Sequence, residues 1–178
     1  MIARLAVVSG ILSLALMAGC SPSGGLYREA AAAAEAGLAV HLRNTIALVT
    51  SLMREQTAPG AVGEAEIARV FGADLRSVSP ASSGPVDGRG VFEITPHANG
   101  DVAFSVLFVS TAFRAAGLTS TNAYAHTCGT LTAGAAGPDV IVTNRECPPE
   151  IAASAAHESV FVPLETVAAD AGVGGSPK

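Results

Sequence analysis

The residues of this 178-residue chain that could carry covalent or metal chemistry are its three cysteines and a few of its histidines. Cys20 ends an apolar N-terminal run, whereas Cys128 and Cys147 stand far along the chain. His126 precedes Cys128 by two positions, so the two side chains share a face if this segment is a β-strand. Imidazole and thiolate groups are ligands for zinc or copper. A possible metal site therefore consists of His126, Cys128, Cys147 and His157.

The first 19 residues have the pattern of an export signal. Arg4 is the only charged residue among them, and an uncharged run of 13 residues follows over positions 5–17. A helix needs about 20 apolar residues to span a bilayer, so a run of this length is typical of a signal peptide. The small residues Ala18 and Gly19 then precede Cys20, which suits cleavage by a peptidase with a narrow site.

The segment Leu16-Met17-Ala18-Gly19-Cys20 resembles the lipobox of bacterial lipoprotein precursors. The resemblance implies cleavage before Cys20 and attachment of a diacylglycerol thioether to its sulfur. Because two or more acyl chains anchor a protein stably, it also implies a lipid-anchored protein on the extracytoplasmic face of the cell membrane or outer membrane. A plain secretory signal with a chance cysteine, or an uncleaved anchor, is the alternative.

An exported chain enters an oxidising compartment, where disulfides form and persist. With Cys20 lipidated, Cys128 and Cys147 remain as a pair. If these two cysteines oppose each other in a hairpin, its centre falls between Gly137 and Pro138, inside a turn-rich stretch. This agreement predicts a Cys128–Cys147 disulfide that stabilises the fold by about 3 kcal/mol. We therefore expect no metal ion and no other cofactor.

The charge balance argues against a nucleic-acid partner. The chain has 10 lysine and arginine residues and 15 acidic residues, so its formal net charge is −5 and nothing in it would neutralise a row of phosphates. Apolar residues make up 49% of the chain, which is enough for the core of one domain.

One long helix is expected over residues 27–56. Alanine, the best helix former, is dense over 30–34. Apolar residues then recur at steps of three or four positions, as they do on one face of a helix. These residues are Leu38, Leu42, Ile46, Val49 and Met53. A shorter helix is expected over 64–76, followed by a loop over 77–90.

Strands are expected in the second half of the chain. Asn99-Gly100 is a strong signal for a tight hairpin turn. The expected strands are residues 91–96, 101–110, 124–133, 140–147 and 160–164. Together, the elements predict an α+β fold, in which the long N-terminal helix packs on a small antiparallel β-sheet with a disulfide-clamped hairpin. The predicted organisation is a signal peptide over 1–19, a lipidated tether over 20–26, a single domain over 27–171 and a disordered tail over 172–178.

The sequence contains no motif of a known catalytic site. It has no G-x-S-x-G elbow, no S-x-x-K pair, no phosphate-binding glycine loop and no H-E-x-x-H zinc motif. We therefore expect no enzyme, and we interpret the protein as a lipid-anchored envelope protein with a non-catalytic binding or assembly role. An envelope protein partner would meet a sheet edge or the loop expected over 111–122, which carries Arg114 as its one charge.

Two alternatives remain open at this stage. A pilin-like structural subunit would share the order of a long helix followed by a sheet and a disulfide loop, but would polymerise through the helix. A small envelope hydrolase or metal-binding protein would use His126, Cys128 and His157, and would require free thiols.

Overall fold

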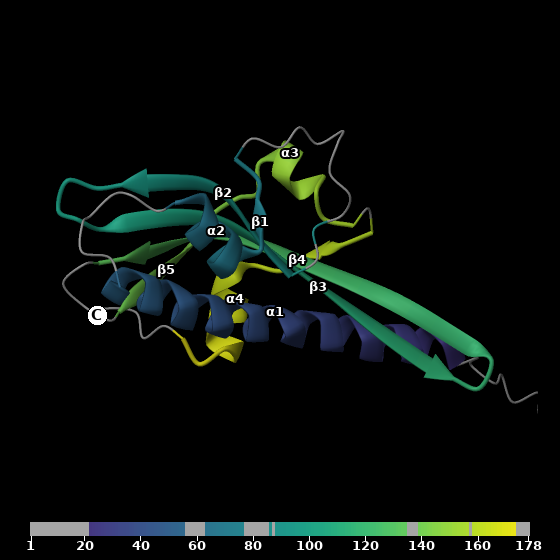
Figure 1. The fold of residues 1–178 in the computed structure, drawn as a ribbon. Coiled ribbons are helices and arrows are strands. Elements are labelled where there is room, and N and C mark those ends of the chain that lie inside the picture. The colour runs from purple at the N-terminus through teal and green to yellow at the C-terminus, as the bar shows by residue number, and fades with distance from the viewer. Residues whose placement is uncertain are drawn as a thin grey trace, which may run out of the picture.

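A computed structural model describes residues 22–55, 63–76, 86, 88–134, 139–156 and 158–173. Within these residues one long helix, α1, lies across one face of a β-sheet, and the shorter helices α2 and α4 pack on the same side (Figure 1). The predicted signal peptide, Cys20 and His157 lie outside the described residues.

Helix α1 (Pro22–Glu55) is the main helix of the core. It begins at Pro22, a residue that is favoured in the first turn of a helix, so it includes most of the stretch expected as a tether. One face of α1 is fully buried against the sheet because its small and branched residues recur at helical spacing. The buried residues of this face are Ala30, Ala34, Leu38, Leu42, Thr45, Val49 and Leu52.

Helix α2 (Glu64–Phe71) is shorter than the sequence indicates. It ends at Gly72, whose φ of 71° is in the left-handed region that glycine adopts without strain. The chain then enters strand β1 (Ala73–Asp74), so the helix expected to continue to residue 76 is wrong in its second half.

The sheet has the order β1-β2-β3-β4-β5, and strand β6 (Val160–Phe161) pairs with β4. Strand β2 (Gly88–Pro96) is parallel to β1, and β6 is parallel to β4, so the sheet is mixed and the prediction of a purely antiparallel sheet is wrong. A parallel partner needs a crossover rather than a hairpin. Helix α3 (Pro149–Ala152) lies in the connection that returns the chain from β5 (Val140–Asn144) to β6.

Strands β3 (Val102–Ala116) and β4 (Thr119–Ala133) form one long hairpin. Their antiparallel pairing runs without interruption to Ala116 and Thr119, which leaves a turn of only two residues. The prediction of a loop over 111–122 is therefore wrong. Most of the residues there are small or polar, but each strand supplies the backbone hydrogen-bonding groups that the other needs.

The hairpin between β2 and β3 is confirmed. The backbone N–H of His97 donates to the carbonyl of Asp101 at 2.8 Å, and Gly100 has a φ of 88°. Strand β2 begins at Gly88, inside the stretch expected as a loop over 77–90.

Side chains on the two faces of the sheet form two apolar clusters. The larger lies between the sheet and helices α1, α2 and α4, and includes Phe71 and Phe104 with ring centroids 5.2 Å apart. The smaller lies on the opposite face, where Leu107, Val109 and Cys128 are buried under the segment that carries α3.

The C-terminal segment closes the larger cluster. Helix α4 (Leu164–Asp170) begins where the last strand was expected to end, and the N–H of Leu164 donates to Asn144 Oδ1 at 3.0 Å. Of the predicted disordered tail, Gly172 and Val173 are described, and Val173 packs against the core.

Candidate functional site

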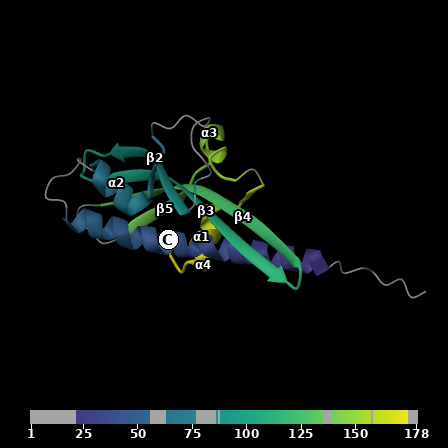
Figure 2. The same ribbon diagram turned by 45° about the vertical axis from the view of Figure 1, so that its right-hand side comes forward.

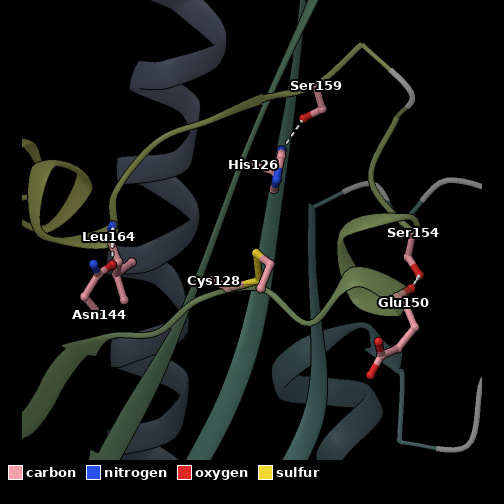
Figure 3. The surroundings of a disulfide bond; sticks show 8 residues. His126, Cys128, Asn144, Glu150, Ser154, Ser159 and Leu164 are labelled. Carbon is pink, nitrogen blue, oxygen red and sulfur yellow. Dashed lines mark hydrogen bonds between the residues drawn. A yellow bond between two sulfur atoms is a disulfide. The ribbon is translucent and has the colours of Figure 1, made fainter.

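The disulfide between Cys128 and Cys147 is confirmed. The two sulfurs are 2.08 Å apart and the Cα atoms are 5.3 Å apart (Figure 3). The register that supported the prediction is different, however. Direct opposition of the cysteines would pair Gly129 with Glu146, whereas the ladder pairs Gly129 with Asn144 and ends there. Cys147 therefore reaches Cys128 from the segment that follows β5, as a clamp on the end of the ladder.

His126 lies on the same face of β4 as Cys128, as the spacing predicts (Figure 3). Its Nδ1 atom shares a hydrogen bond with Ser159 Oγ at 2.8 Å, and its ring meets the edge of Phe161 at 5.6 Å between centroids. Burial lowers the pKa of His126 below its usual value, because a buried imidazole is harder to protonate. These contacts hold His126 in place as part of the packing between β4 and β6.

The metal alternative is not supported by the described residues. Cys128 and Cys147 are bonded to each other, so neither sulfur is a thiolate ligand, and His157 lies outside the described part of the chain. Within that part, no three histidine, cysteine, aspartate or glutamate side chains come together as a metal site would require.

A polar network that the sequence analysis missed lies beside the disulfide. Arg145 Nη1 donates to Glu93 Oε2 at 2.5 Å and also to Ser105 Oγ, and the guanidinium group lies 5.4 Å from the centre of the Phe92 ring. The hydrogen bond from Arg145 holds the pKa of Glu93 below its usual value. The network joins β2, β3 and the segment before Cys147, and no local motif could have revealed it.

The far end of the β3–β4 hairpin, residues 111–122, is named the arm. It extends along α1 towards the N-terminal end of that helix (Figures 1 and 2). The helix and the arm approach closely at the base of the arm. A Cβ atom added to Gly37 of α1 would lie only 2.1 Å from Ser110 Oγ. At the tip of the arm Leu118 is fully exposed, and further back on β3 Phe113 is 59% exposed.

A second exposed region is strand β5. It forms the end of the sheet order, so in the described part of the chain no strand pairs with its outer edge. The strand contains neither charge nor proline, which are the residues that usually protect an edge from pairing. Ile141 is 63% exposed on the face away from α1. Such an edge can accept a further strand.

Helix α1 also bears on membrane attachment. The segment Gly24–Glu55 is long and apolar enough to cross a membrane by length and composition, a test that core helices and signal sequences also pass. Only 33% of its most apolar stretch is buried, so packing of one face against the sheet accounts for part of its apolar character.

The fold and these sites define an α+β domain with a long N-terminal helix on a mixed sheet, a disulfide clamp and two exposed apolar regions. No protein-family model, no curated protein and no solved structure matches the chain.

Proposed function

We propose that this protein is a lipid-anchored envelope protein on the extracytoplasmic face of a bacterial membrane, with a non-catalytic role in binding or assembly. The lipobox-like segment that ends at Cys20 supports the anchor. Cys20 stands two residues before Pro22, where α1 begins, and two residues of chain reach at most about 7 Å. A lipid on Cys20 would therefore hold the N-terminal end of α1 at the membrane surface.

The observation that carries the binding role is the exposed edge of β5 at the other end of the domain. Strand β5 pairs with the last residues of β4, so it lies about 13 residues, or roughly 40 Å, along the strand from the hairpin turn. An extended segment of a partner can add to such an edge through backbone hydrogen bonds, with side-chain pockets setting the specificity. The β5 edge would face away from the membrane, towards other envelope proteins.

The other functions considered have less support. Polymerisation of a pilin-like subunit through α1 would need a free apolar stripe, but Ala30, Leu38 and Leu42 are fully buried against the sheet. A hydrolase or metal-binding site would need free thiols, and Cys128 and Cys147 are bonded to each other.

Three measurements test the proposal. The intact mass of the protein extracted from membranes should equal residues 20–178 plus two or three acyl chains, and Cys20→Ala should release the protein from the membrane fraction. A photo-crosslinking amino acid at position 141 should then capture one defined envelope protein. The matched control is the same amino acid at Val40, an exposed apolar position on α1. An unmodified Cys20 would contradict the anchor. Identical crosslinked products from positions 141 and 40 would contradict the binding role of the β5 edge.

A further inference from the structure

We infer that the tip of the arm is a second membrane contact, which places Leu118 in the bilayer surface that holds the lipid of Cys20. This inference rests on the proposed anchor and names the partner of the arm. Residues 111–122 are one of the two places, with a sheet edge, where the sequence predicts contact with a protein partner, but in the structure these residues lie at the end of the domain where the anchor would attach (Figure 2).

The first observation is the residue at the apex. In a two-residue hairpin turn of type II′ glycine takes the first position, and the second position has no special backbone requirement. Here Gly117, with a φ of 60°, is followed by Leu118, and Leu118 is the most exposed of the large apolar side chains in the described residues. Phe113 is also exposed, about 10 Å back along the strand. If the apex enters the interface to the depth of about 5–10 Å that the apolar faces of interfacial helices reach, Phe113 lies at the surface of the bilayer.

The second observation is the position of the tip relative to α1. Ala123 and Ala125, at the base of the arm, pack in the same cluster as Ala30 and Ala34 near the beginning of α1. Figures 1 and 2, which differ by a rotation of 45°, both show the tip beside the N-terminal end of the helix. With Cys20 within about 7 Å of that end, an anchored chain presents the tip to the same bilayer surface.

The third observation is charge. The chain as a whole is acidic, and a negative surface would be repelled by anionic lipids. Between Asp101 and Asp139, however, Arg114 is the only charged residue, so no carboxylate lies on the arm. Hydroxyl and amide side chains follow the turn, and these can hydrogen-bond to lipid headgroups. They are Thr119, Ser120, Thr121 and Asn122.

Two other exposed apolar side chains, Ile141 and Phe161, lack this combination. Ile141 lies on β5, roughly 40 Å along the strand from the turn. Phe161 lies on β6 and already packs against the ring of His126. An apolar apex, proximity to the anchor and absence of carboxylates therefore coincide at the arm.

The test uses the lipidated, disulfide-bonded chain in vesicles of phosphatidylethanolamine and phosphatidylglycerol. Leu118→Cys, Phe113→Cys and the control Ile141→Cys each carry one environment-sensitive fluorophore, and nitroxide-labelled lipids serve as the quencher. All three side chains are exposed, so the substitutions should leave the unfolding midpoint unchanged. We expect quenching at 118 to exceed that at 141 by at least about threefold, with a blue-shifted emission, and quenching at 113 to be intermediate.

The outcomes separate the two proposals. An intact mass without acyl chains on Cys20 overturns the proposed function, and the inference falls with it. A lipidated chain in which positions 118 and 141 are quenched equally overturns the inference and leaves the anchor standing. Quenching at 118 that is lost when phosphatidylcholine replaces only the phosphatidylglycerol would still support the contact, and would assign it to Arg114 and anionic headgroups.

Discussion

Reduction of the Cys128–Cys147 disulfide should lower the free energy of unfolding by about 3 kcal/mol. The bridge closes a loop with a sequence separation of 19, and the chain-entropy model gives about this value for a loop of that length. Cys147 lies in the segment after β5 and is only partly buried, so it can move away from the buried Cys128 when the bond breaks. The effect should therefore come from the unfolded chain, which gains freedom when the loop opens.

Urea denaturation followed by far-ultraviolet circular dichroism measures this difference, since the chain has no tryptophan to serve as a fluorescent probe. With a slope of about 2 kcal/mol per molar urea, the midpoint should fall by about 1.5 M on reduction. The thermal midpoint should fall by roughly 6–12 °C for a domain of this size. A chain with Cys20→Ser has only Cys128 and Cys147 and avoids the lipid.

The control is the double variant Cys128→Ala and Cys147→Ala, whose midpoint should not respond to the reductant. Thiols that can be alkylated before reduction would refute the bridge itself. A bridge that is closed by this criterion, but whose reduction changes the free energy by less than about 1 kcal/mol, would refute the entropic reasoning and indicate that the unfolded chain keeps the two segments together.

Three further predictions follow from particular side chains. Gly129→Ala should lower the free energy of unfolding by about 1–3 kcal/mol, because its Cβ atom would lie 1.9 Å from Leu164 Cδ2, and an unchanged urea midpoint would show that α4 can move aside. Thr127→Val should raise it by about 1 kcal/mol, because the buried hydroxyl has no hydrogen-bond partner in the described residues, and a loss of stability in the same assay would reveal a hidden partner. Burial lowers the pKa of His126 from its usual value of 6.5. As the pH falls, the imidazole is therefore protonated in the unfolded chain before it is protonated in the folded one. The wild type should lose stability as the pH falls below about 6.5. Urea midpoints at pH 7.5 and 5.5 should differ more for the wild type than for His126→Gln. Equal differences would contradict the assignment of this pH dependence to His126.

Local patterns in the sequence were sufficient for elements whose hydrogen bonds are local. The apolar stripe from Leu38 to Val49 predicts the face of α1 that is buried, because helical spacing alone places these side chains on one side. Asn99-Gly100 predicts the turn between β2 and β3 for the same reason. The pairing of Cys128 with Cys147 was also predicted, although by a register that differs from the observed ladder by two residues.

The arm shows where local patterns are insufficient. Apart from Phe113 and Leu118 its residues are small or polar and show no alternating apolar pattern, so the sequence predicts a loop over 111–122. They form strands because each half supplies backbone partners to the other over its whole length. The Glu93–Arg145 ion pair is similar, because it joins residues 52 positions apart that meet only when β2 and the segment after β5 lie over the same face of the sheet.

The sequence by itself determined the composition of the core, the long amphipathic helix, the central hairpin signal and the pair of cysteines. Each of these follows from residue types and from spacing within one or two turns of chain. Only the tertiary structure decided that Gly72 ends α2 early, that β1 and β6 pair in parallel with their neighbours, and that the turn between β3 and β4 lies at the same end of the domain as the start of α1. These features depend on long-range backbone pairing, in which the partner strand rather than the local sequence selects the conformation.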